Sequence, residues 1–252
     1  MLSLLLRSLE FGFYHCLLSA VDRVSRLPRN TTMPEAARLY RENIALKAQL
    51  DVLEARQQAV DLLDAMKIAQ ADLVGNSFGG ALALALAIAH PQRVRRLVLM
   101  GSVGVPFEIT PGLDAVWGYT PSITTMRGLL DIFAYNPALA TDDLAQLRYQ
   151  ASIQPGFQEA FAAMFPAPRQ RWVDAMVSPQ AAIRALPHPT LVVHGREDRV
   201  IPLANSLTLA SWIVRAQLHV FGQCGHWTQI EHAARFAQLV DNFLAEADAQ
   251  VH

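Results

Sequence analysis

The sequence predicts an α/β domain built around a mostly parallel sheet, and three observations support this fold class. The chain has 252 residues, of which 52% are hydrophobic and 17% charged, which suits one compact domain or a domain with an appended segment. Short apolar runs end at turn residues, as strands buried on both faces do. Helical patterns separate these runs, which is typical of parallel strands.

Apolar runs at 71–74, 96–100, 190–193 and 218–221 are the candidate strands. Helical patterns cover 79–90, which Pro91 ends, about 203–213 and about 231–248. In open parallel sheets the carboxyl ends of the strands share one edge, and catalytic groups gather there. Residues that directly follow the runs are therefore the candidates for a functional site.

Residues 102–189 form a segment that is too long for an ordinary crossover, since connections in compact domains usually have a handful of residues. The segment is rich in aromatic residues and prolines. This composition predicts a helical lid over an apolar substrate pocket. The alternative is a helical insertion that only packs around a small core of its own.

Residues 1–58 differ in kind and are interpreted as an atypical helical leader, which leaves 59–252 as the α/β core. Between 33 and 60, mostly apolar residues recur at steps of four and three, with Asn43 and Gln57 as polar positions. A short coiled coil would have this pattern and would make the chain a homo-oligomer. An amphipathic helix packed on its own chain would have the same pattern.

Charge and cysteine content exclude several kinds of partner. The net charge is −1 and the longest basic run is 93–96, so no nucleic-acid partner is expected. Residues 1–25 are largely apolar, but Arg7, Glu10 and Asp22 interrupt them and a basic n-region is lacking, so we expect neither a signal peptide nor a membrane partner. The 2 cysteines give no disulfide framework, which favours a reducing compartment, the cytoplasm.

The most informative motif is Gly-Asn-Ser-Phe-Gly at 75–79, between a candidate strand and a candidate helix. A Gly-x-Ser-x-Gly motif in this context is the signature of a nucleophile elbow, in which a strained turn exposes the serine and the glycines let strand and helix approach closely. Ser77 is then the candidate nucleophile. The alternative is a plain structural turn.

A serine hydroxyl needs a histidine to take its proton and a carboxylate to orient that histidine. With an elbow of this kind the partners follow in the order serine, acid, histidine. Asp198 lies just beyond the third candidate strand and His226 just beyond the fourth. Asp198 could instead cap a helix, with Glu197 as the acid, and His226 could be an ordinary loop histidine. Cys224 and His226 alone are too few ligands for a metal site.

The segments 75–80, 194–199 and 224–232 together resemble the meta-cleavage product hydrolases of the α/β-hydrolase superfamily, and most of all the 2-hydroxymuconic semialdehyde hydrolases. The similarity extends from about residue 60 to about 248. The resemblance implies hydrolysis of a carbon–carbon bond in an aromatic ring-fission product, in aromatic-compound catabolism. The products would be 2-hydroxypenta-2,4-dienoate and a small carboxylic acid, with no metal or organic cofactor.

The resemblance also assigns roles to residues. It implies a catalytic triad of Ser77, Asp198 and His226, an oxyanion donor in the Phe78 backbone N–H, and an acid end of the substrate lined by Asn76, Arg148 and Trp227. A guanidinium suits that place because it binds a carboxylate through two parallel hydrogen bonds. Arg148 in a lid salt bridge and Trp227 in the core are the alternatives.

The resemblance fails before Ser77. The family has a His-Gly pair with a Gly-rich loop, which supplies a second oxyanion N–H, and then an Asp-x-x-Gly-x-Gly-x-Ser loop, and neither stands there. We therefore expect a truncated gene fused to an unrelated leader. Losing one oxyanion donor costs about 10²-fold to 10³-fold in turnover. A general carboxylesterase and an inactive truncated fusion are the competing functions.

Overall fold

The computed structural model describes residues 55–246. Its sheet is parallel, with strand order β1-β2-β3-β4, and the strands run along the chain as β1 Ala71–Asn76, β2 Val94–Met100, β3 Thr190–Gly195 and β4 Ala216–Phe221. All the predicted strands are confirmed, each two residues longer than its apolar run. Apart from Val94, the extra residues are polar or small, which an apolar pattern alone does not report.

Apart from a helix over 55–65, which precedes β1, the helices lie between and after these strands. They are α3 Phe78–Ala89, η4 Pro91–Arg93, α4 Pro111–Trp117, α5 Ile123–Phe133, η5 Pro137–Leu139, α6 Asp142–Ser152, α7 Phe157–Met164, α8 Gln170–Ala175, α9 Gln180–Arg184, α10 Leu203–Trp212, α11 Thr228–Glu231 and α12 Ala233–Ala245. The predicted helices at 79–90 and 203–213 are confirmed as α3 and α10. The third predicted helix, at about 231–248, is confirmed as α12, which begins after His232, the residue that separates it from the short α11.

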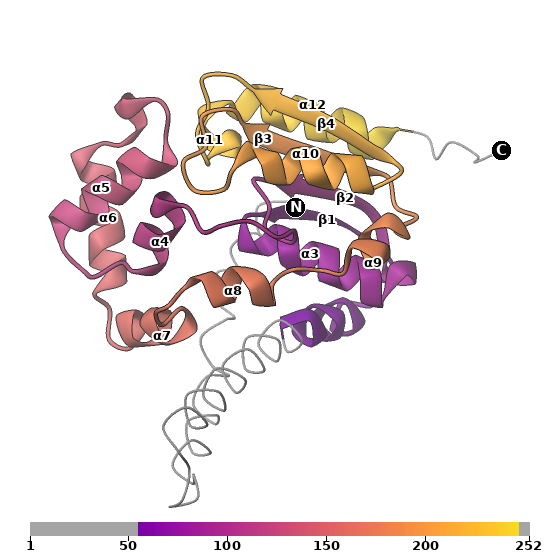
Figure 1. The fold of residues 1–252 in the computed structure, drawn as a ribbon, viewed down its shortest axis with the longest axis horizontal. Coiled ribbons are helices and arrows are strands. Elements are labelled where there is room, and N and C mark those ends of the chain that lie inside the picture. Colours follow the sequence, from indigo (N-terminus) through magenta and orange to yellow (C-terminus); the bar gives the residue numbers. More distant parts are fainter. Residues whose placement is uncertain (1–54, 247–252) are drawn as a thin grey trace, which may run out of the picture.

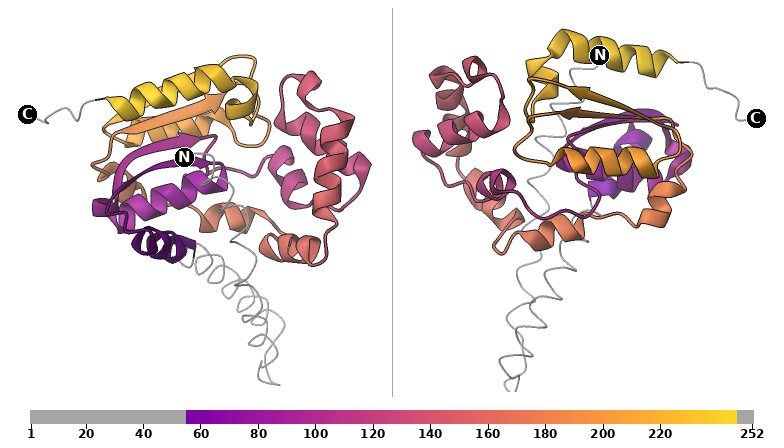
Figure 2. Two further views of the ribbon diagram at one scale, coloured as in Figure 1. Left: turned by 180° about the vertical axis from the view of Figure 1, so that it is seen from behind. Right: turned by 45° about the horizontal axis from the view of Figure 1, so that its top comes forward.

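Helices cover both faces of the sheet (Figures 1 and 2). On one face α3, α9 and α10 pack with Leu97, Leu99 and Val192 of the strands, and Val60 of the helix over 55–65 joins the same cluster. On the other face α12 packs through Val240 and Phe243 against the alternate strand residues. The central strands β2 and β3 are thus buried on both sides, as their apolar runs predict, whereas β1 and β4 at the ends of the sheet are only partly buried.

Helices α4 to α7 form a separate layer beside the sheet edge at which the strands end (Figure 1). Two apolar clusters hold this layer, one around Trp117, Phe165 and Trp172 and one around Leu130 and Trp227. We call the segment from α4 to α7 the lid. Helix α9, by contrast, buries Ile183 in the cluster on the sheet. The division of the chain at residue 58 and the extent of the lid stay predictions.

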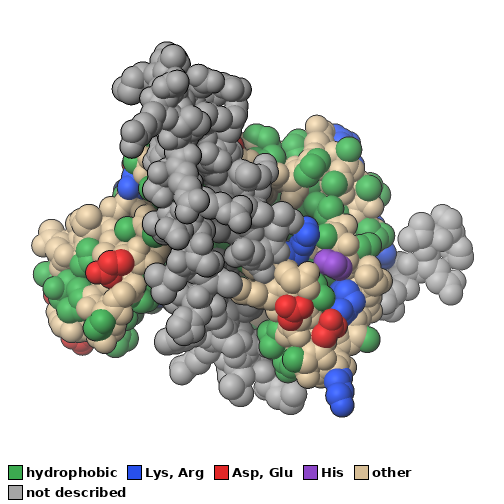
Figure 3. Space-filling view, turned by 90° about the horizontal axis from the view of Figure 1, so that it is seen from below, with side chains coloured by type: hydrophobic (Ala, Val, Ile, Leu, Met, Phe, Trp, Pro, Cys, Tyr) green, Lys and Arg blue, Asp and Glu red, His purple; other side chains and the backbone are tan. Residues whose placement is uncertain are grey.

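Most of the predicted leader and the coiled-coil pattern fall in residues 1–54, outside the described residues. Within the described range no helix is long and apolar enough to cross a membrane. Figure 3 shows basic and acidic side chains interspersed on the described surface of one face, without a gathering of Lys and Arg there.

Candidate active site

Ser77 lies in the turn between β1 and α3, with φ 55° and ψ −117°, a conformation that few residues other than glycine adopt. Strand and helix approach closely, since a Cβ on Gly75 would lie 2.6 Å from the Gly79 carbonyl carbon. The Ser77 N–H donates to the Met100 carbonyl of β2 at 2.9 Å, which fixes the turn to the neighbouring strand. The turn therefore has the backbone geometry of a nucleophile elbow.

Asp198 and His226 form a buried hydrogen-bonded pair, with side chains 1% and 3% exposed. The distance from His226 Nδ1 to Asp198 Oδ2 is 2.8 Å, and because a carboxylate only accepts, Nδ1 carries the hydrogen. Asp198 Oδ1 accepts from the backbone N–H groups of Val200 at 2.7 Å and Ile201 at 3.0 Å. The carboxylate is thus held by its own loop and orients the imidazole.

The serine turn and the Asp–His pair meet at the end of β2. Gly101 follows Met100, the residue that accepts the Ser77 N–H. A Cβ on Gly101 would lie 3.1 Å from Asp198 Oδ2 and 3.2 Å from His226 Nδ1. The predicted triad residues therefore leave the ends of β1, β3 and β4 and gather around the end of β2, at the edge where the sheet topology predicts them.

Glu197, the alternative acid, is turned to other partners. Its Oε1 accepts from Arg196 Nε at 2.8 Å, and its Oε2 accepts from the Cys224 backbone N–H at 3.0 Å. The Cys224 N–H is the main cause that lowers the pKa of Glu197. Of the two neighbouring carboxylates, Asp198 is the one that contacts His226.

A second histidine, which the sequence did not predict at the site, also approaches Asp198. His194 is fully buried, and its Nε2 lies 3.0 Å from the Ile201 carbonyl and 3.4 Å from Asp198 Oδ2. Its Nδ1 accepts from the Ser206 hydroxyl at 2.7 Å, since the carbonyl requires the hydrogen on Nε2. Burial lowers the pKa of His194 more than Asp198 raises it, so the ring is neutral at pH 7.

The residues assigned to the substrate lie close to the triad candidates or to each other. Trp227 is 6% exposed and stacks on Phe133 with ring centres 4.9 Å apart, and the Arg148 guanidinium carbon lies 4.9 Å from the Trp227 ring centre. Asn76 ends β1, and its buried Oδ1 has no hydrogen-bond partner among the described residues. Phe78 opens α3, so its N–H lies at the amino-terminal end of that helix.

Cys224 offers no competing nucleophile. Its side chain is fully buried, and burial is the main cause that raises the pKa of the thiol to about 12. The group therefore stays protonated at neutral pH. Over residues 55–246 no cluster of three or more His, Cys, Asp or Glu side chains could hold a metal ion.

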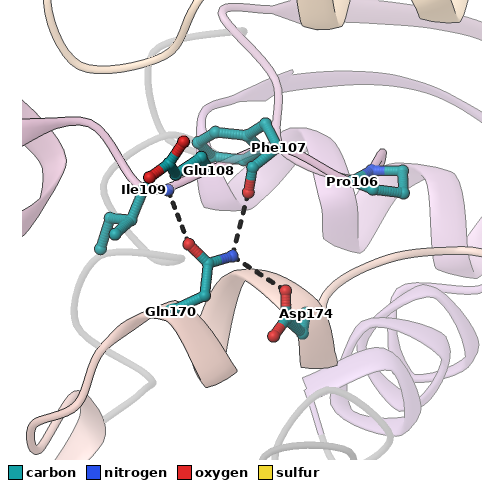
Figure 4. A pocket seen from close by; sticks show the side chains of 6 residues that line it. All are labelled: Pro106, Phe107, Glu108, Ile109, Gln170 and Asp174. Atoms are coloured by element: carbon teal, nitrogen blue, oxygen red, sulfur yellow. Dashed lines mark hydrogen bonds between the residues drawn. The ribbon is translucent and has the colours of Figure 1, made fainter.

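An open groove of about 610 Å³ lies at the root of the lid, between the segment after β2 and α8 (Figure 4). Gln170 crosses it, accepting from the Ile109 N–H at 2.7 Å and donating to the Phe107 carbonyl at 3.0 Å and to Asp174 at 2.9 Å. The bonds to Phe107 and Ile109 hold the segment that leads from β2 into the lid against α8. The groove holds no member of the predicted triad.

Gly195 sets how closely the acid loop and the histidine loop approach. A Cβ there would overlap the Gly225 carbonyl oxygen and lie 2.6 Å from the Cys224 carbonyl oxygen. We expect Gly195→Ala to lower the free energy of unfolding by about 1–3 kcal/mol, as overpacking does. We also expect it to lower kcat about 100-fold, because it displaces His226 from Asp198.

Chemical denaturation and steady-state kinetics measure both effects. The control is Gly128→Ala in α5, where a Cβ would meet nothing within 4 Å. It should stabilise the helix by about 0.5–1 kcal/mol and leave kcat unchanged. A Gly195→Ala protein with wild-type stability would contradict the close approach.

Comparison with known proteins agrees with this architecture. Residues 45–233 match the family model described as alpha/beta hydrolase fold. The parallel sheet, the elbow and the acid and histidine loops thus define the chain as a member of the α/β-hydrolase class.

Similar proteins show to which family within the α/β-hydrolase class the chain belongs. The 2-hydroxymuconate semialdehyde hydrolase of Pseudomonas sp. (strain CF600) is 76% identical over 191 residues, covering 76% of this chain and 68% of the relative. The 2-hydroxy-6-oxo-2,4-heptadienoate hydrolase of Pseudomonas putida is 63% identical over 187 residues, covering 74% and 68%. A solved meta-cleavage product hydrolase from Pseudomonas fluorescens, a mutant complexed with acetates, has a TM-score of 0.77 at 57% identity, covering 78% of this chain and 72% of that chain. The chain belongs to the meta-cleavage product hydrolases.

Sequence reasoning missed His194, Phe133 and Glu231 near the site. His194 and Glu231 stand inside the motifs that carry the resemblance, so their proximity to Asp198 and His226 along the chain was the available signal. Phe133 comes from the lid, and nothing in the sequence indicates that it stacks between lid and core.

Proposed function

We propose that the chain hydrolyses a carbon–carbon bond in a ring-fission product of the 2-hydroxymuconate semialdehyde type, with Ser77, His226 and Asp198 as the triad. One observation carries the proposal: the buried Asp198–His226 hydrogen bond of 2.8 Å stands beside the strained Ser77 turn, in a chain 76% identical to a hydrolase of that substrate. With the semialdehyde and water as reactants, the products are 2-hydroxypenta-2,4-dienoate and formate.

The chemistry assigns each residue a step. His226 moves a proton that converts the substrate dienol to its keto form, which makes the carbon leaving group a stabilised dienolate. His226 then takes the Ser77 proton as the hydroxyl oxygen attacks the terminal carbonyl carbon, and Asp198 stabilises the imidazolium that forms. The Phe78 N–H stabilises the oxyanion. The carbon–carbon bond breaks, the dienolate is protonated, and water releases formate from the serine ester.

An assay with the yellow ring-fission product as substrate tests this function directly. Purified protein should bleach the absorbance of the substrate, and formate should appear in equal amount to the substrate lost. Absence of bleaching above the buffer rate at high protein concentration would contradict the proposal.

Arg148 distinguishes this function from that of a general carboxylesterase. Arg148→Ala removes a guanidinium that we assign to the substrate carboxylate, so kcat/KM for the ring-fission product should fall about 30-fold to 1000-fold. Hydrolysis of p-nitrophenyl acetate, which has no carboxylate, should change less than about threefold. The kinetic constants for both substrates are the measurement.

Arg127→Ala is the matched control, because Arg127 of α5 is a lid arginine that pairs with Asp142 at 3.2 Å. It should leave both activities close to wild type. Equal losses on the two substrates in Arg148→Ala would show that Arg148 supports the lid and does not bind the carboxylate.

A further inference from the structure

A carboxylate outside the predicted triad connects the lid to the loop that bears His226. Glu231 is the last residue of α11 and is half-buried. Its Oε1 accepts from the Gly225 N–H at 2.6 Å, one residue before His226. Its Oε2 accepts from the N–H groups of Tyr135 and Asn136, both at 2.9 Å. One side chain thus binds two backbone segments that lie some ninety residues apart in the chain.

The two segments touch directly as well. The His226 N–H donates to the Phe133 carbonyl at the end of α5, at 2.8 Å. A Cβ on Gly225 would lie 2.9 Å from the Tyr135 nitrogen and 3.1 Å from Glu231 Oε1, so this position has no room for a side chain. The Phe133 ring faces the His226 ring with centres 5.9 Å apart. The His226 backbone is therefore bonded directly to the lid, and the Gly225 N–H before it is bonded to the side chain that also binds the lid turn.

We propose that Glu231 is a positioning residue for His226, and that its carboxylate ties the lid turn at 134–136 to the histidine loop at 224–226. An ionised carboxylate has acceptor sites for all three N–H groups and binds each more strongly than a neutral oxygen does. A glutamine of the same shape has one oxygen, so its amide group would face either Gly225 or the lid turn with a donor against a donor. The side chain of residue 231 then no longer holds the lid turn and the histidine loop in a fixed position relative to each other.

Amide exchange and kinetics of Glu231→Gln test this link between the lid turn and the histidine loop, which we call the Glu231 tie. Exchange at Gly225, Tyr135 and Asn136 should become about tenfold faster or more, because their acceptor is weakened or lost. The kcat should fall about 10-fold to 100-fold while KM changes less than about threefold, since the substrate is still bound but the base is misplaced. The control is Asp114→Asn, which breaks the 3.1 Å pair between Asp114 of the lid and Arg169 just before α8 and should leave kcat and these amides unchanged.

A second pair of variants tests the Glu231 tie by changes in the lid turn. Asn136→Pro deletes the N–H that Glu231 accepts, and its φ of −80° suits proline. Asn136→Ala keeps the N–H and loses only the side-chain bond to Ala138 that both variants lack. We expect kcat of the proline variant to be about tenfold below that of the alanine variant. This pair decides the question if Glu231→Gln fails to melt cooperatively.

Only the kinetic part rests on the proposed function. If the wild-type protein does not bleach the ring-fission product, the proposed function fails, and the exchange rates of Glu231→Gln still decide whether the tie exists. Wild-type exchange at the three amides would overturn the proposal. So would equal kcat in the two Asn136 variants, or an equal loss of kcat in Asp114→Asn and Glu231→Gln.

Discussion

Ser77→Ala is expected to lower kcat for the ring-fission product about 10⁵-fold to 10⁶-fold, with the fold intact. Removing the hydroxyl oxygen removes the atom that forms the bond to substrate, and neither Asp198 nor His226 can replace it. The rate of absorbance loss measures the effect. Helix α3 should persist, because Ser77 makes no side-chain bond at the helix start.

Two controls make the Ser77 result specific. Ser211→Ala in α10 removes a hydroxyl that donates to the Thr208 carbonyl at 2.8 Å, and it should leave kcat unchanged. Adding His226→Ala to Ser77→Ala should cost little more, because members of a triad act as one unit. A Ser77→Ala protein that keeps more than about 1% of the wild-type rate would exclude a serine-dependent reaction at this site.

The sequence predicted the elements that carry the site because short-range rules determine them. Apolar runs set the strands, and the Gly-x-Ser-x-Gly motif sets the elbow, where backbone contact leaves no room for a Cβ on Gly75, while a Cβ on Gly79 would meet nothing within 4 Å. The order serine, acid, histidine then placed Asp198 just beyond the third candidate strand and His226 just beyond the fourth. All these signals lie within a few residues of the feature that they predict.

Contacts across long stretches of chain were not predictable in the same way. Whether Glu197 or Asp198 faces His226 depends on the loop conformation, in which Val200 and Ile201 turn back to the Asp198 carboxylate. The tie through Glu231 uses backbone N–H groups, which every residue except proline possesses, so no residue type marks the partner segment. Such pairings become visible only when the lid is placed against the core.

Asp198→Asn is expected to lower kcat about 10⁴-fold with little change in structure. The N–H groups of Val200 and Ile201 both donate to Oδ1, so the amide oxygen of the asparagine will take that position. The amide nitrogen must then face His226 Nδ1 at the place of Oδ2 and donate to it. His226 is left with its hydrogen on Nε2, where it cannot accept the proton of Ser77.

Glu197→Gln is the matched control for this change. Its carboxylate binds Arg196 and the Cys224 N–H and makes no contact with His226, so kcat should fall less than about tenfold, as expected for loss of one hydrogen bond outside the triad. Bleaching rates of the two variants, measured beside their thermal melts, give the comparison. The opposite ranking would make Glu197 the catalytic acid and would show that the Asp198–His226 bond serves folding alone.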